Sequence, residues 1–132
     1  MKEDSRAILK KYLLYITPAR LSMLKIFLQT NEALTYNHFL NHPSFRADRI
    51  TIFRTLKIFT DKQIIHRIPA PDGIKRYSLQ QASENVHSNF MCIRCKRITP
   101  LKTIIPHKIK LPKGFRQKNI EIIIDGLCNI CK

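Results

Sequence analysis

The hydrophobic period of the chain changes within residues 48–68, DRITIFRTLKIFTDKQIIHRI. Over about residues 49–62, apolar side chains recur at the i, i+3, i+4 and i+7 spacing of an amphipathic helix, for which Asp48 is a suitable N-cap. From Ile64 to Ile68 the β-branched run is typical of a strand. The stretch therefore predicts a helix that is followed directly by a strand.

The segments on either side extend this pattern. Residues 6–14 and 17–28 have helical periodicity, and a third short helix is predicted over residues 36–42. After the strand, residues 69–73 have turn chemistry and residues 76–79 are a second strand candidate, which together predict a hairpin. Helices that lead into a hairpin in this order predict a winged helix-turn-helix. The last helix takes the recognition position, and the hairpin is the wing.

The charge of the chain favours a polyanionic partner. Its 132 residues include 24 Lys and Arg against 9 Asp and Glu, a formal net charge of +15. Residues 1–82 carry 14 basic and 6 acidic side chains and residues 83–132 carry 10 and 3, so the excess is not confined to one detachable tail. Such an excess is typical of nucleic-acid binding, with a solvated lysine-rich surface that binds nothing as the alternative.

Composition argues against several other classes of function. The chain has three glycines, none close enough to another to build a phosphate-binding loop. Its few acidic residues are scattered, and no nucleophile–base pair indicates an enzyme. No stretch approaches 18 uninterrupted apolar residues, which excludes a membrane-spanning helix. The first residues lack the layout of a signal peptide, so we expect a cytoplasmic protein whose thiols stay reduced.

The C-terminal part of the chain has the periodicity of a small β-rich module. Residues 81–85 are polar and are expected to form a linker, and strands are expected over residues 86–93, 97–101 and 119–126. The module at 86–132 is short for an independent hydrophobic core. We therefore expect it to need a staple, a partner subunit, or both.

The four cysteines of the chain occur as two identical pairs, Cys92-x-x-Cys95 and Cys128-x-x-Cys131. Each pair can form a tight turn that presents two thiolates to one ion, and two such turns complete a tetrahedral zinc site. Disulfides, free thiols, a redox dithiol and an iron–sulfur cluster are the alternatives, although a reducing compartment argues against disulfides. A closed four-thiolate site leaves the metal no open position, so it predicts a structural role rather than catalysis.

In the order and spacing of its motifs, the chain resembles the ferric uptake regulator family of bacterial metal-responsive repressors. The resemblance runs from about Thr17 to Cys131 and covers most of the chain. The motifs that carry it are Thr17-Pro18-Ala19-Arg20, Thr51-Ile52-Phe53-Arg54-Thr55-Leu56, Ile64-Ile65-His66-Arg67, His87-x-x-Phe90-x-Cys92-x-x-Cys95, Leu111-Pro112-Lys113-Gly114-Phe115 and Gly126-Leu127-Cys128-x-x-Cys131.

The resemblance implies an α+β fold with two domains. An N-terminal winged helix-turn-helix over residues 1–80 would bind DNA, and a small zinc-stapled α/β domain over residues 86–132 would form a homodimer. Such a dimer binds an inverted-repeat operator in double-stranded DNA and usually represses. The residues expected to contact DNA are Arg20, Arg49, Thr51, Phe53, Arg54 and Lys57. Phe53 stands where relatives usually have Tyr, so its ring can pack on a thymine methyl but cannot donate a hydrogen bond.

Sensory members of the family hold a second, regulatory metal, and most of its ligands are missing here. Where relatives often have His or Glu, this chain has Ala33, Ser78, Asn89 and Ile120. His87 remains as a candidate ligand, and residues 102–112 look too short and proline-broken for the helix that usually supplies a carboxylate. His38 and His42 have a chelating i, i+4 spacing but no third ligand nearby in sequence. The regulatory site is therefore expected to be degenerate, or rebuilt from Glu84, His87, Glu121 and Asp125.

A zinc-stapled RNA-binding or ribosome-associated protein is the alternative from another class. Zinc ribbons and strong basicity are common among such proteins. This alternative explains neither the recognition-helix pattern nor the wing. The sequence therefore favours a DNA-binding regulator.

Overall fold

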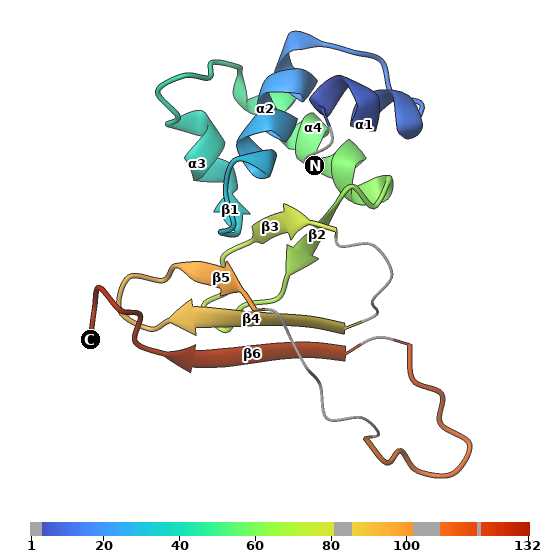
Figure 1. Ribbon diagram of the computed structural model, residues 1–132, viewed down its shortest axis with the longest axis vertical. Helices are drawn as coiled ribbons and strands as arrows, with labels where there is room; N and C mark the ends of the chain where they lie inside the picture. Colours follow the sequence, from blue (N-terminus) through green and yellow to red (C-terminus); the bar gives the residue numbers. More distant parts are fainter. Residues whose placement is uncertain (1–3, 81–85, 102–108, 119) are drawn as a thin grey trace. The chain divides into compact units, whose positions relative to one another are not determined.

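The chain divides into two compact units, Met1–Gln80 and Gln81–Lys132, which are described separately below (Figure 1). The computed structural model describes residues 4–80, 86–101, 109–118 and 120–132. The linker predicted over residues 81–85 lies outside the described residues. No helix in the described part of the chain is both long enough and apolar enough to cross a lipid bilayer.

The N-terminal unit combines helices with a small antiparallel sheet. Its helices are α1 (Ser5–Lys11), α2 (Pro18–Leu28), α3 (Tyr36–Leu40) and α4 (Arg49–Asp61). Its strands are β1 (Leu34–Thr35), β2 (Ile65–Ile68) and β3 (Arg76–Leu79). Strand β3 lies between β1 and β2 and is antiparallel to both, so β2 and β3 form the predicted hairpin after α4.

Side-chain caps fix where three of these helices begin. Thr17, Thr35 and Asp48 precede α2, α3 and α4, and each side chain accepts a hydrogen bond from the backbone N–H three residues further on. Each cap satisfies one of the amide groups that a helix N-terminus leaves without an internal partner. All three helix starts agree with those expected from the sequence.

The helices of this unit pack their apolar faces around one core. On α4 the buried side chains are those predicted from the sequence, Ile52, Thr55, Leu56 and Phe59. On α2 the buried side chains are Met23, Leu24, Ile26 and Phe27, whereas Leu21 and Leu28 are only partly buried. Because this core fixes the rotation of α4 about its axis, the opposite face of α4 is turned to solvent.

Helix α1 is shorter than the sequence suggests. It was expected to run to residue 14 but ends at Lys11, because Leu13 adopts a left-handed backbone conformation with φ 58°. The N–H of Leu14 then donates to the carbonyl of Leu9 at 2.9 Å, which closes the helix end in the manner of a Schellman motif. Glycine usually takes this position, so a leucine gave no signal of the helix end.

Helix α3 also ends early, at Leu40 rather than residue 42, with Asn41 as its C-cap. Strand β1 was not predicted. It contains only two residues, which is too short to produce an alternating pattern, and it exists because Leu34 and Thr35 pair with Tyr77 and Arg76 of β3.

The C-terminal unit contains a three-stranded sheet formed by β4 (Val86–Cys92), β5 (Ile98–Pro100) and β6 (Ile120–Gly126). Strand β4 is central, antiparallel to β5 and parallel to β6, and Figure 1 shows β4 and β6 side by side. The register places Cys92 opposite Gly126, so the two strands end together. The described residues of this unit contain no helix.

Candidate DNA-binding face and four-cysteine metal site

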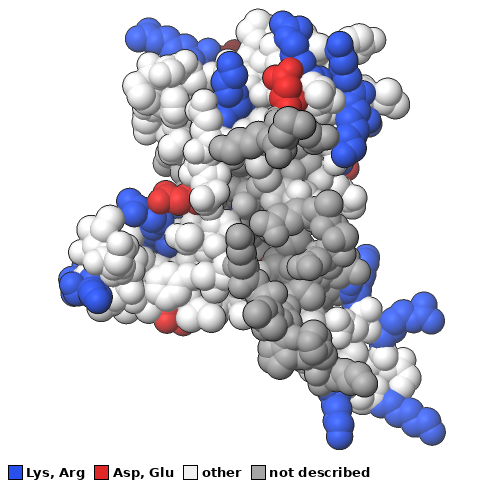
Figure 2. All heavy atoms as spheres, viewed as in Figure 1, with Lys and Arg blue, Asp and Glu red and all other residues white. Residues whose placement is uncertain are grey.

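The solvent face of α4 is basic and carries one large aromatic ring. The side chains of Arg49, Arg54 and Lys57 are exposed, and Phe53 is 57% exposed. Thr51 is only partly exposed. The structure thus brings the predicted contact residues of α4 onto the face opposite the core. Figure 2 shows more Lys and Arg than Asp and Glu side chains standing out from the face in view.

Asp48 holds the N-terminus of α4 by a hydrogen bond. Its Oδ1 accepts from the backbone N–H of Thr51 at 2.8 Å. This bonding to Thr51, helped by the nearby charge of Arg54, holds the pKa of the Asp48 carboxyl below its usual value. The carboxylate is therefore ionised at neutral pH and offsets part of the positive charge at the start of α4.

Aromatic contact ties Phe53 to a residue outside α4. The ring of Phe53 lies 5.0 Å from the ring of Tyr36, centroid to centroid, at an interplanar angle of 43°. Tyr36 is the first residue of α3 and lies far from Phe53 in sequence, so periodicity could not reveal this pair. The contact restricts the directions that the exposed ring of Phe53 can take.

Lys57 makes an ion pair within its own helix. Its Nζ lies 3.3 Å from Oδ2 of Asp61, one turn further along α4, and both side chains are largely exposed. Exposed pairs of this type contribute little to stability. The ammonium of Lys57 therefore stays available to an incoming anion.

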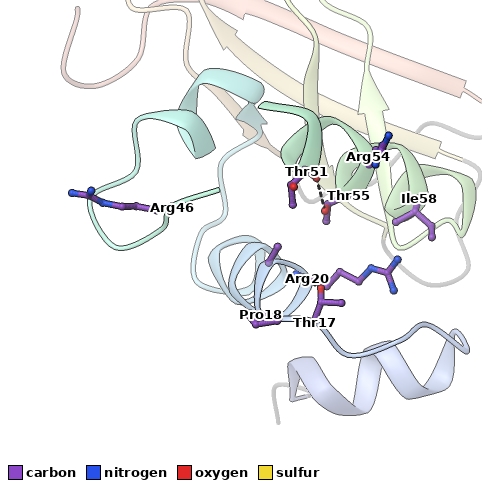
Figure 3. A pocket seen from close by; sticks show the side chains of 9 residues that line it. Thr17, Pro18, Arg20, Arg46, Thr51, Arg54, Thr55 and Ile58 are labelled. Carbon is purple, nitrogen blue, oxygen red and sulfur yellow. Dashed lines mark hydrogen bonds between the residues drawn. The ribbon is translucent and has the colours of Figure 1, made fainter. Parts of the chain in front are cut away.

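A groove of about 650 Å³ lies between the start of α2 and the side of α4. Figure 3 shows its lining, which comprises Thr17, Pro18, Ala19, Arg20, Arg46, Thr51, Arg54, Thr55 and Ile58. The Arg20 guanidinium is held in place because its Nη1 donates to the backbone carbonyl of Tyr15 at 2.8 Å. The sequence predicted a role for Arg20 and Arg54 but not for Arg46, which lies in the loop before α4.

The turn between β2 and β3 is braced by a buried ion pair. Both terminal nitrogens of Arg76 donate to the Asp72 carboxylate, at 2.7 and 2.8 Å, and the two side chains are only 4% and 14% exposed. The same carboxylate accepts from the N–H of Ile74, and Gly73 supplies the positive φ of 75° that the turn requires. Sequence reasoning predicted the turn but missed the pair.

The four cysteines come together at the end of the C-terminal sheet. Because β4 and β6 are parallel and end together, the two Cys-x-x-Cys turns that follow them meet. The Sγ atoms of the four cysteines all lie within 4.8 Å of one another. None of the four cysteines, Cys92, Cys95, Cys128 and Cys131, is in a disulfide. Sγ of Cys95 and Sγ of Cys128 are 3.9 Å apart.

Backbone and side-chain groups stabilise both turns. The backbone N–H of Cys128 lies 3.5 Å from Sγ of Cys92, and the guanidinium of Arg94 donates to the carbonyl of Cys131 at 2.8 Å. The first turn closes with Lys96 in a left-handed conformation, φ 66°. Arg94 thus bonds the first cysteine turn to the second, a contact that spacing alone did not indicate.

The sulfur atoms differ strongly in acidity. Hydrogen bonds from the backbone N–H groups of Cys95 and Cys128 lower the pKa of Cys92 to about 5. Hydrogen bonding to Cys128 and burial raise the pKa of Cys131 to about 12. A thiolate beside a thiol that retains its proton is the pattern expected when four sulfurs crowd together. A divalent cation that prefers sulfur, such as zinc, would bind here as the protons leave.

Residues considered for a regulatory metal are distributed over both units. Ser78 lies opposite His66 in the β2–β3 pair of the N-terminal unit, and Asn89 is buried in β4 of the C-terminal unit. His87 lies opposite Glu121 in the β4–β6 register, but its side chain is outside the described residues. Within the described ranges, the four cysteines are the one group of three or more potential ligands close enough to share an ion.

Comparison with known proteins identifies the family. Residues 12–124 match the model of the ferric uptake regulator family. The ferric uptake regulation protein of Synechococcus elongatus is 26% identical over 126 residues, covering 89% of this chain and 85% of the relative. That of Bacillus subtilis is 22% identical and covers 88% of this chain and 84% of the relative.

Solved structures show the same fold. The ferric uptake regulator of Vibrio cholerae matches with a TM-score of 0.70 at 18% identity, covering 95% of this chain and all of that chain. A zinc uptake regulator solved in complex with zinc and DNA matches with a TM-score of 0.61 at 18% identity, covering 95% of this chain and 88% of the other. The family consists of transcription regulators and not of enzymes. The chain therefore belongs to the ferric uptake regulator family of DNA-binding transcriptional regulators.

Proposed function

We propose that this protein is a homodimeric repressor that reads an inverted-repeat operator with α4. The observation that carries the proposal is the exposed face of α4, where Arg49, Phe53 and Arg54 stand opposite a fully packed core. Arginine can read guanine in the major groove through two hydrogen bonds, and an aromatic ring can contact a thymine methyl group. A helix that presents both is suited to the major groove. Membership in a family of DNA-binding regulators does not favour the RNA-binding alternative.

Dimerisation through β6 would supply the two-fold symmetry of such an operator. In the described part of the C-terminal unit, β6 is at the edge of the sheet and pairs with no strand other than β4. Ile124 is 51% exposed, and Ile122 and Ile123 are only partly buried. A second copy would bury this apolar strand, and a two-fold dimer presents one recognition helix to each half-site.

Zinc held by Cys92, Cys95, Cys128 and Cys131 would stabilise the C-terminal unit. The zinc ion would have a structural role alone, because four thiolate ligands leave no coordination position for a substrate. It would connect the ends of β4 and β6 in addition to the sheet pairing and the hydrogen bond from Arg94 to Cys131. The dimer surface on β6 would then depend on the metal.

We further propose that DNA binding requires no second, regulatory metal. Solved relatives include the ferric uptake regulator of Francisella tularensis with iron and a zinc-bound manganese uptake regulator. Here Ala33, Ser78, Asn89 and Ile120 replace the His and Glu ligands that are common in relatives. Alanine and isoleucine offer no ligand atom, and serine and asparagine are poor ligands for these ions.

Competition binding tests the central proposal. Labelled palindromic duplex is titrated with protein at fixed salt, and an unlabelled structured single-stranded RNA is offered as competitor. We expect the duplex to remain bound and Arg54→Ala to weaken binding by about 1–3 kcal/mol if Arg54 reads a base. Lys25→Ala is the matched control, because Lys25 is an exposed basic residue at the opposite end of α2. Displacement by RNA, or unchanged affinity of Arg54→Ala, would contradict the proposal.

A further inference from the structure

The groove between α2 and α4 contains a basic residue that is outside the recognition helix. Arg46 lines this groove together with Arg20 and Arg54, although Arg46 belongs to the loop between α3 and α4. No carboxylate of the described residues lies within ion-pair distance of any of these three guanidinium groups. Their charges are therefore available to a ligand.

The arginine side chains do not converge on one point. In Figure 3, Arg46 extends away from the groove on one side, while the guanidinium of Arg20 lies on the other side, between α2 and α4. Arg20 is fixed in that position by its hydrogen bond to the carbonyl of Tyr15. A compact anion such as free phosphate would contact one of these groups at a time. A polymer with regularly spaced negative charges can contact both.

The rest of the groove lining is also suited to a polyanion. Its lining includes the first turn of α2, an eleven-residue helix capped by Thr17, and Thr51 on α4. The first turn of a helix carries partial positive charge, and threonine hydroxyls are common partners of DNA phosphates. The positive end of α2 and the spread of the arginines thus favour the same kind of ligand.

We propose that this groove receives the sugar–phosphate backbone of one DNA strand, with Arg20 and Arg46 on different phosphates. The inference rests on the proposed function and extends it, because it adds Arg46 to the interface and separates two tasks. The groove positions the duplex and contributes affinity for any sequence, whereas the exposed face of α4 reads the bases. Phosphate contacts fix register without carrying sequence information.

Salt dependence distinguishes the two tasks. Each phosphate contact contributes about −0.9 to the slope of log affinity against log salt concentration. Arg46→Ala should therefore make the slope shallower by about one, by the same amount on a palindromic operator and on a scrambled duplex. Arg46→Lys should keep most of the slope because it keeps the charge. Lys25→Ala should leave the slope unchanged, and thermal unfolding confirms that each variant is folded.

A second experiment tests whether the groove binds a free anion instead: sodium phosphate is added to the protein–DNA complex at constant ionic strength. Millimolar phosphate should not displace the duplex from the wild-type protein. Displacement that Arg46→Ala abolishes would assign the groove to a free anion instead. An unchanged slope in Arg46→Ala, or a loss confined to the operator, would overturn the backbone assignment while wild-type DNA binding still stands. Failure of the wild-type protein to bind any duplex would contradict the proposed function itself.

Discussion

The rings of Tyr36 and Phe53 lie 5.0 Å apart and join the first turn of α3 to the exposed face of α4. Phe53 is 57% exposed, yet its ring has a packed neighbour on one side. An exposed aromatic side chain without such support would lose conformational freedom on binding DNA. Tyr36 restricts that freedom in advance, so in the proposed DNA-binding role of α4 it would act as a positioning residue for Phe53.

We expect Tyr36→Ala to weaken operator binding and Tyr36→Phe to leave it nearly unchanged, because the ring and not the hydroxyl makes the contact. Aromatic pairs contribute about 0.5–1.5 kcal/mol, so the loss should be at most about tenfold in affinity. A double-mutant cycle with Phe53→Ala measures the coupling between the two rings. Additive losses would show that Tyr36 does not act through Phe53, and a loss in Tyr36→Phe would assign the effect to the hydroxyl.

Two glycine substitutions at the end of α4 should have opposite effects on stability. Gln63 has φ 62°, a conformation that costs a non-glycine residue about 1 kcal/mol or more, whereas its neighbour Lys62 has φ −83°. Both side chains are exposed. Gln63→Gly should raise the free energy of unfolding by roughly 1 kcal/mol, and Lys62→Gly should lower it. Urea unfolding measures both, and equal effects of the two changes would contradict the strain at Gln63.

The cap of α4 should make part of the stability depend on pH. The pKa of Asp48 is lowered in the folded protein, chiefly by the hydrogen bond from Thr51. The ionised carboxylate therefore stabilises the fold above the unfolded pKa of about 3.9, and this contribution is lost as the pH falls through the lower folded value.

Asp48→Asn keeps a hydrogen-bond acceptor at the N-cap but removes the titration. The difference in unfolding free energy between wild type and Asp48→Asn should thus shrink between pH 6 and pH 3. The comparison cancels the carboxylates and thiols that both proteins share. A difference that stays constant over this range would show that the charge of Asp48 has no part in the cap.

The parts of the structure that depend on local pattern could be predicted from the sequence. The buried face of α4, the three side-chain caps and the β2–β3 hairpin each follow from residue types within one segment. The approach of the two cysteine pairs was also expected, because their chemistry requires a shared ion. The helix face, the caps and the hairpin are determined by interactions within a few residues, and the cysteine cluster is determined by the coordination geometry of one metal ion.

Features that depend on tertiary contact left no such signal. The pairing of Tyr36 with Phe53 arises only after α3 and α4 have packed together. Arg76 and Asp72 are only four residues apart, but the burial of their ion pair depends on the packing around the turn. Arg46 lies in a loop without periodicity, so nothing in the sequence placed it beside α2. Helix α1 ends early because Leu13 adopts a left-handed backbone conformation, which leucine disfavours.

Removal of one zinc ligand should loosen the C-terminal unit. Cys95→Ser or Cys128→Ser leaves three thiolates, which lowers metal affinity, and structural zinc contributes on the order of 10 kcal/mol in small domains. We expect less zinc by elemental mass spectrometry and weaker dimerisation by analytical ultracentrifugation. Asn129→Ser is the control, because Asn129 is exposed and lies between the ligands of the second pair. Serine variants that stay dimeric and bind DNA normally would make the zinc dispensable.

DNA binding should not depend on a metal beyond the structural zinc. A sensor must couple metal binding to operator affinity, and a tenfold effect requires about 1.4 kcal/mol of coupling. The resemblance to the family aligns Ala33, Ser78, Asn89 and Ile120 with the ligands that would supply such coupling. Protein that retains its structural zinc is titrated with iron, manganese or zinc, and operator affinity is measured at each step and again after chelation.

We expect affinity to stay within a factor of two or three of its starting value, since no metal can favour one arrangement of the protein without ligands to hold it. His87→Ala is the informative variant, because His87 is the strongest remaining candidate for a rebuilt site with Glu84, Glu121 and Asp125. A reversible rise of tenfold or more with any second metal, abolished in His87→Ala, would establish a rearranged sensor. The same rise retained in His87→Ala would place the regulatory ligands elsewhere in the chain, and either result would end the proposal that this regulator acts without a second metal.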